Sequence, residues 1–110
     1  MAYDHDLANR VREQLAAEDA LGEMEMFGGV AFLLNGNMAV GVTHDDLMVR
    51  VGKERSDEAA AEPHARPFEM SGRPMRAWVL VEPEGVATDA HLRAWVERGA
   101  AFAKSLPPKA

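Results

Sequence analysis

The chain has 110 residues, 47% of them hydrophobic and 27% charged, which is the composition of one globular domain. It contains no cysteine, so disulfides, thiolate metal ligands and cysteine nucleophiles are excluded. No apolar run is long enough to cross a bilayer, and the acidic start MAYDHDLANR resembles neither a secretory signal nor an Arg-rich transit peptide. We therefore expect a cytoplasmic protein that does not contact a membrane.

The net charge of −6 argues against direct DNA binding, because tight binding needs several Lys or Arg side chains facing phosphates. The one basic stretch is Pro63–Leu80, with three arginines against one glutamate. Three charges produce only a weak field, so this stretch does not predict a nucleic-acid surface.

Residues 4–20 predict an amphipathic helix. Leu7, Val11 and Leu15 recur every four residues, and the acidic residues before them suit a helix N-terminus. We expect this helix to end near Gly22.

The next segment predicts a hairpin between strands. Glu23–Phe27 alternates polar and apolar residues and predicts a short strand, and Gly28-Gly29 allows the backbone to bend. Val30–Leu34 has no polar face, so we expect a strand covered on both sides. Asn35-Gly36 predicts a type I′ turn, because both residues tolerate positive φ. Met38–Val42 is the expected partner strand.

A third strand is predicted over Leu47–Val51. Its period of two places Leu47 and Val49 on one face, and Met48 with Arg50 on the other. The preceding residues His44-Asp45-Asp46 read as a polar turn, although the same three side chains could hold a cation.

The following segment is less regular. Ser56 is a candidate cap for a short helix over Asp57–Ala61. Pro63–Pro74, with three prolines, predicts a loop or an edge strand, and Ala77–Val81 predicts a strand.

The last element is the clearest helix, over residues 88–106. Its apolar positions form one stripe, Thr88 or Asp89 can cap its start, and Pro107-Pro108 stops it. Gly99 lies in the stripe, which predicts close packing of this helix on the sheet. Together the elements predict an α+β fold, an antiparallel sheet with N-terminal and C-terminal helices packed on it.

Several motifs, taken in order, carry a family resemblance. They are Met26-Phe27-Gly28-Gly29, Asn35-Gly36-Asn37-Met38-Ala39, Asp46-Leu47, Arg66-Pro67-Phe68, Gly72-Arg73-Pro74-Met75, Trp78, and Trp95-Val96 with Leu106-Pro107-Pro108. From about residue 20 to residue 108 the chain resembles the TfoX N-terminal domain of the TfoX/Sxy family.

The resemblance implies an α+β fold with an antiparallel sheet and kinship with bacterial regulators of natural competence. Those regulators act with a cyclic-AMP receptor protein at promoters and carry a second, C-terminal helical domain. We expect residues 1–110 to form a single domain of the N-terminal kind without that second domain. The family supplies no catalytic residues to carry over.

No catalytic or metal-binding set is visible in the sequence. The histidines are far apart and lack the spacing of metal ligands, and the serines lie outside any Gly-x-Ser-x-Gly motif. These residues are His5, His44, His64, His91, Ser56, Ser71 and Ser105. We therefore predict no enzyme, no metal and no cofactor.

The best candidate for ligand binding is a set of four arginines: Arg50, Arg66, Arg73 and Arg76. Guanidinium groups held by a rigid backbone can bind a carboxylate or phosphate with two parallel hydrogen bonds. The alternative is that they pair with acidic residues of this chain, such as Glu69 or Glu82. A sensor of a small anionic ligand is therefore one hypothesis.

The methionines support a second hypothesis. Core filling is the commonest role of Met, but several methionines on an uncovered sheet face would form an apolar patch for a partner. The candidates are Met24, Met26, Met38, Met48, Met70 and Met75, together with Trp78. We favour a non-enzymatic accessory protein that binds a protein partner or itself as a dimer, and that is linked to transcription or competence through that partner.

Overall fold

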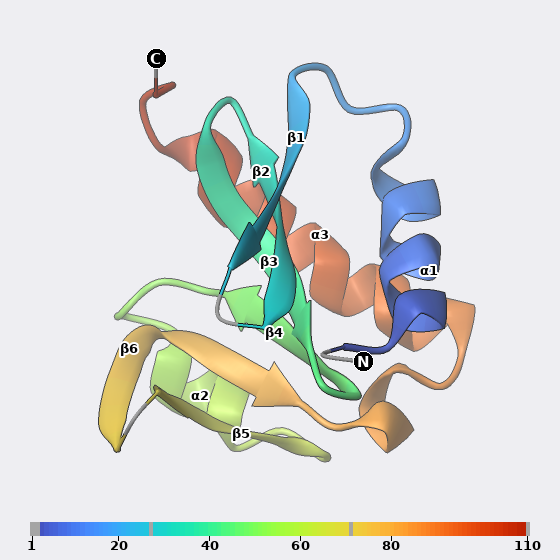
Figure 1. Ribbon diagram of the computed structural model, residues 1–110. Helices are drawn as coiled ribbons and strands as arrows, with labels where there is room; N and C mark the ends of the chain where they lie inside the picture. The colour runs from blue at the N-terminus through green and yellow to red at the C-terminus, as the bar shows by residue number, and fades with distance from the viewer. Residues whose placement is uncertain (1–2, 27, 71, 110) are drawn as a thin grey trace.

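Six antiparallel strands form one sheet in the computed structural model, in the order β1-β2-β3-β4-β6-β5 (Figure 1). The structure describes residues 3–26, 28–70 and 72–109, and the side chains of Met26 and Met70 are not described. The elements are α1 (His5–Leu15), β1 (Leu21–Met26), β2 (Gly29–Leu34), β3 (Asn37–Thr43), β4 (Asp46–Arg50), α2 (Ser56–Ala60), β5 (Ala65–Met70), β6 (Arg73–Val81), the 3-10 helix η1 (Pro83–Val86) and α3 (Asp89–Ser105). This confirms the predicted α+β fold.

Helix α1 begins as predicted but ends earlier. The Asp4 carboxylate accepts hydrogen bonds from the backbone N–H groups of Asp6 and Leu7, which caps the helix. The helix ends at Leu15 rather than near residue 20, because residues 16–20 (AAEDA) offer no apolar face to bury. The chain then reverses, and strand β1 starts at Leu21.

The central hairpin follows the prediction closely. Asn35 and Gly36 have φ of 54° and 82°, as a type I′ turn requires, and they join β2 to β3. Gly28 has φ of 74°, which explains the bend before β2. The predicted strand over residues 23–27 corresponds to β1, and Phe27 lies outside the described residues.

The hydrophobic core lies on one face of the sheet. Alternate strand residues, such as Phe32, Val40 and Val49, pack there against α1, α2 and α3. The prediction that Val30–Leu34 is covered on both sides agrees with the burial of β2, in which only Leu33 is half-buried, although the helices lie on one face only. Ala31 points to the other face, where it is buried without a helix above it.

Helix α3 packs closely on β3 at Gly99. A Cβ atom at this position would lie 2.4 Å from the Ala39 carbonyl oxygen and 2.6 Å from Val40 Cγ1, so a side chain does not fit. Thr88 caps the helix by accepting a hydrogen bond from the His91 N–H at 3.1 Å. The predicted close packing at Gly99 is confirmed.

The second half of the sheet is built from β4, β6 and β5. Strand β6 pairs with β4 on one side and with β5 on the other, so Ala65–Met70 is an edge strand, which is one of the two alternatives predicted for Pro63–Pro74. The β5–β6 hairpin runs in a clearly different direction from β1 and β2, so the sheet is strongly twisted (Figure 1). Ser56 does not cap α2, because it lies inside the helix and donates a hydrogen bond to the Lys53 carbonyl.

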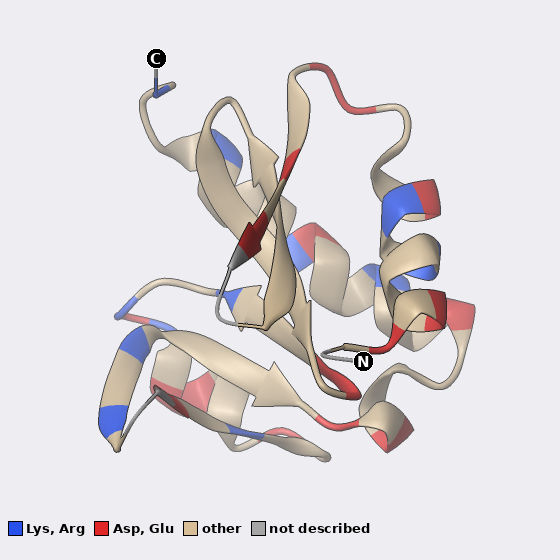
Figure 2. Ribbon diagram, viewed as in Figure 1, with Lys and Arg blue, Asp and Glu red and all other residues tan. Residues whose placement is uncertain are grey.

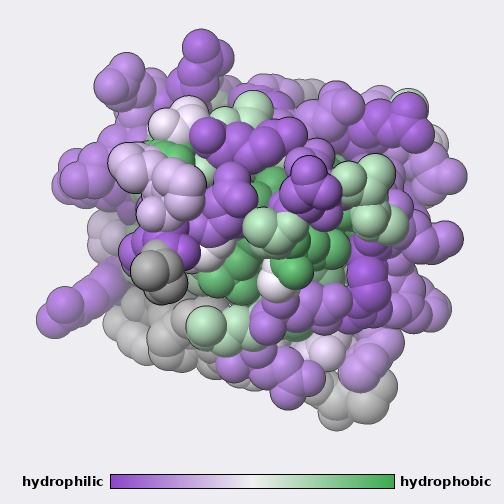
Figure 3. Space-filling view, turned by 90° about the horizontal axis from the view of Figure 1, so that it is seen from above, coloured by the Kyte–Doolittle hydropathy of each residue, from purple (hydrophilic) through white to green (hydrophobic). Residues whose placement is uncertain are grey.

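Charged residues are distributed over helices, strand ends and loops (Figure 2). Seen from above, the molecule presents mainly polar side chains, with apolar ones gathered near the middle of the view (Figure 3). Of the helices in the described part of the chain, none combines the length and the apolar character needed to span a membrane.

Candidate binding site on the open face of the sheet

One row of residues crosses the sheet from edge to edge on the face without helices, which we call the open face. Each residue in the row is directly opposite the next in the strand register, so their side chains share a face. The row is Met24, Ala31, Gly41, Met48, Leu80 and Arg66. Two small residues, Ala31 and Gly41, therefore stand between two long methionines.

This arrangement leaves a hollow of about 660 Å³ on the open face, which is within the size range of ligand-binding pockets. Most of its lining residues are apolar, and we call these the floor of the hollow. We call its polar lining residues the rim, and they are Thr43, His44, Asp46, Arg66 and Glu69. The lining residues are Ala31, Met38, Thr43, His44, Asp46, Met48, Arg66, Pro67, Phe68, Glu69, Met75, Trp78 and Leu80.

Three of the methionines named in the sequence line this hollow: Met38, Met48 and Met75. All three are partly buried, while Met24 at the sheet edge is 49% exposed and lies outside the hollow. The structure therefore places several methionines on the uncovered face, which is the arrangement that the second hypothesis required.

The rim of the hollow contains a carboxylate, Asp46, whose negative charge has no cation of the described chain within hydrogen-bond distance. Its side chain is only 19% exposed, and the nearest cationic nitrogen, Nη2 of Arg66, is 4.0 Å away, too far for a hydrogen bond. Burial raises the pKa of the Asp46 carboxyl, and the charge of Arg66 offsets part of that effect. The Asp46 carboxylate would therefore gain from a closer cation.

Arg50 does not line the hollow. Its Nη1 donates to the Met38 carbonyl oxygen at 3.3 Å, and its guanidinium lies over the Phe102 ring, 5.4 Å from the centroid. The Nε atom of Arg50 is buried and has no hydrogen-bond partner among the described residues. This arginine is held by the fold rather than directed toward the other three.

Arg66 is the only one of the four arginines that lines the hollow in the described structure. It is 55% exposed and lies 3.7 Å from Glu82 and 4.0 Å from Asp46. Arg73 and Arg76 are exposed on β6, and Arg73 is the register partner of Met70, which lies four residues after Arg66 on β5. At about 3.3 Å per residue this separates Arg66 and Arg73 by about 13 Å along the strand. An anion site made by all four arginines stays a prediction, and this spacing does not favour it.

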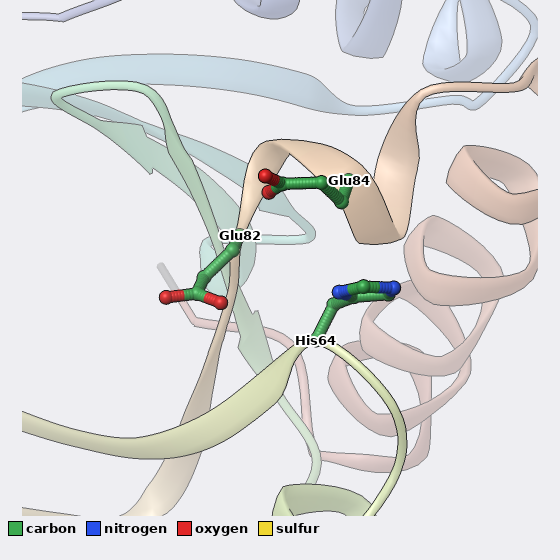
Figure 4. A group of neighbouring side chains, drawn as sticks. All are labelled: His64, Glu82 and Glu84. Atoms are coloured by element: carbon green, nitrogen blue, oxygen red, sulfur yellow. The ribbon is translucent and has the colours of Figure 1, made fainter.

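His64, Glu82 and Glu84 form a second group of polar side chains, with one donor atom from each lying within 4.8 Å of the others. In Figure 4 the two carboxylates extend to one side, while the His64 ring extends to the other. The backbone brings them together, because the Glu82 N–H donates to the His64 carbonyl at 2.8 Å. His64 and Glu84 are exposed and Glu82 also faces Arg66, so solvent and an existing ion pair satisfy these groups without a metal.

The serines considered as nucleophiles are engaged elsewhere or not described. Ser56 donates to the Lys53 carbonyl, Ser105 donates to the Phe102 carbonyl, and Ser71 lies outside the described residues. Both described hydroxyls therefore serve local backbone turns rather than a base.

The fold and the hollow define a small α+β domain with helices on one sheet face and an apolar hollow on the other. The family model of the TfoX N-terminal domain matches residues 13–103. This match covers most of the 110 residues, so the chain belongs to the TfoX N-terminal domain family, as its motifs indicated. Neither the curated proteins nor the solved structures contain a match to the chain.

Proposed function

We propose that this chain is a non-enzymatic accessory protein that binds a protein partner through the hollow on the open face. The observation that carries the proposal is the hollow itself, lined by methionine, phenylalanine, tryptophan and leucine side chains where no helix covers the sheet. Methionines adapt their shape to different contacts, and aromatic side chains are enriched where proteins bind one another. The proposed role is to act on transcription through that partner, which fits the kinship with competence regulators.

The formal charge of −6 supports a protein partner over DNA, because phosphates would be repelled. A second copy of the chain is one protein that could fill the hollow. Light scattering at tens of micromolar distinguishes a self-associating chain from one that needs a different partner. The sensor hypothesis predicts instead a site that responds to anions through Arg66, the arginine at the rim.

Selection from a random peptide library tests the proposal. We expect the wild-type protein to enrich peptides with apolar anchor residues, and calorimetry to give dissociation constants in the micromolar range. Met48→Gln keeps the length of the side chain but makes the floor of the hollow polar, so it should weaken the selected peptide about tenfold or more.

Met24→Gln is the matched control, because Met24 belongs to the same row but lies outside the hollow. It should leave the affinity within about twofold of wild type, as expected for substitution at an exposed position. Equal weakening by both variants, or no enrichment of any peptide, would contradict the proposal.

A further inference from the structure

We propose that the segment bound in the hollow is basic, with a Lys or Arg side chain placed against Asp46 and an apolar residue near Trp78. This inference rests on the proposed function and specifies the chemistry of the partner. It depends on the charges at the rim, the position of Asp46 and the spacing of the hollow's two ends.

The rim of the hollow is acidic overall. Asp46 and Glu69 line it together with the single cation Arg66, and Glu82 lies 3.7 Å from that cation. Arg66 is thus shared between acidic groups, at distances longer than a hydrogen bond. A further cation is attracted to such a rim, and an anion is repelled.

Asp46 also lies where the charged head of a long basic side chain could reach it while the stem packs on apolar surface. Its carboxylate is mostly buried and receives no hydrogen bond from any described side chain. Lys and Arg place their apolar stems along apolar surface while the charged head reaches a polar group. The floor beside Asp46, which includes Met48 and Leu80, provides that apolar surface.

The two ends of the hollow set a spacing for the ligand. Asp46 begins strand β4, and Trp78 is the register partner of Arg50, four residues further along the same strand. Four residues of extended chain cover about 13 Å, and residues four apart point to the same side of a strand. An extended peptide would therefore place a basic residue and an apolar anchor about four positions apart.

The charge of the whole chain favours this occupant over a second copy. Each copy has a formal charge of −6, so two copies repel each other, whereas a basic segment is attracted. Peptides selected against the wild-type protein should therefore contain Lys or Arg about four residues from an aromatic or aliphatic residue.

Three small probes with the same alkyl chain test the inference: n-hexylammonium, 1-hexanol and hexanoate. Binding is followed by two-dimensional NMR of the full chain, with the Trp78 indole as the reporter. The Trp95 indole is an internal control, because Trp95 belongs to α3 and lies in the core on the opposite face of the sheet. We expect n-hexylammonium to bind about twofold to fivefold more tightly than the other two probes, as for a partly exposed ion pair.

Asp46→Asn should reduce that preference to less than about twofold while leaving the affinity for 1-hexanol unchanged. Asp45→Asn is the matched control. Asp45 is the neighbouring residue, its side chain is exposed and does not line the hollow, and the substitution removes the same charge. Glu69→Gln should lower the preference by a smaller factor, and it replaces Asp46→Asn as the decisive variant if that protein does not fold.

The outcomes separate this inference from the proposed function. The proposal of a basic segment is wrong if 1-hexanol shifts the Trp78 signal and n-hexylammonium binds no more tightly than 1-hexanol. It is also wrong if Asp46→Asn and Glu69→Gln both keep the preference for n-hexylammonium. In either case the proposed binding of apolar groups in the hollow is still supported. Tighter binding of hexanoate would also overturn the inference. If none of the three probes shifts Trp78, the hollow does not accept apolar groups and the proposed function fails as well.

Discussion

Replacing Gly99 with alanine is expected to destabilise the protein, although alanine is the better helix former. In an open helix the substitution would gain about 1 kcal/mol. Here the new Cβ would lie 2.4 Å from the Ala39 carbonyl oxygen and 2.6 Å from Val40 Cγ1. Overpacking of this kind costs about 1–3 kcal/mol, and a backbone carbonyl in a strand cannot rotate away, so we use the upper part of that range. The expected net loss is about 1–2 kcal/mol in the free energy of unfolding.

Urea denaturation followed by far-UV circular dichroism measures this loss as a lower midpoint. Ala101→Gly is the control, because Ala101 is exposed two residues further along α3 and should lose about 1 kcal/mol from helix propensity alone. If Gly99→Ala raised the midpoint by the amount that propensity predicts, α3 would not pack on β3 as described. The assignment of the covered face and the open face would then be wrong.

Three further predictions concern charged groups. Burial raises the pKa of Asp46, so its ionised form destabilises the fold at neutral pH. The Asp46→Asn protein should therefore be at least as stable as wild type in thermal melts at pH 7, and a clearly lower melting temperature would contradict this. Hydrogen bonds from Arg12, at 2.6 and 2.8 Å, lower the pKa of Glu23. The ion pair therefore stabilises the protein at pH values above the usual pKa of Glu, and this contribution is lost as the pH falls through the lowered pKa. Solvent exposure keeps the contribution below about 1 kcal/mol. Glu23→Gln should therefore flatten the acid side of the stability profile, and an unchanged profile would contradict the pairing. Inorganic phosphate and citrate should shift the melting temperatures of wild type, Arg66→Ala and Arg73→Ala equally, whereas a shift lost in both variants would support the anion sensor.

Local signals in the sequence predicted most of the elements correctly. The Asn35-Gly36 turn, the alternation over Leu47–Val51 and the stripe of the last helix depend on neighbouring residues, so they can be recognised without the fold. The glycine in that stripe also predicted close packing, because Gly is unfavourable in a helix interior unless contact requires it. The end of α1 was missed because the alanines after Leu15 are good helix formers, and only tertiary packing shows that they have nothing to cover.

The candidate site could be predicted only in part. The sequence supported the hypothesis that several methionines face outward. The hollow, however, is lined by residues from β2, β3, β4, β6 and β5, and only the pairing of these strands brings those residues together. The insertion of β6 between β4 and β5 brings Arg66 beside Asp46, two residues that are twenty positions apart. The same fold directs Arg50 to the Met38 carbonyl, away from the other arginines. Sequence spacing carries no information on these contacts, because they arise from strand order.

The seven methionines offer the most direct test of the central claim, that the open face is the binding surface. Methyl-labelled methionine can be observed by NMR while a peptide selected against the wild-type protein is added. The account predicts that the methyl signals of Met38, Met48 and Met75 shift together with increasing peptide, while that of Met24 stays in place. Shifts confined to Met24, or binding that leaves the three hollow methionines unchanged, would contradict it.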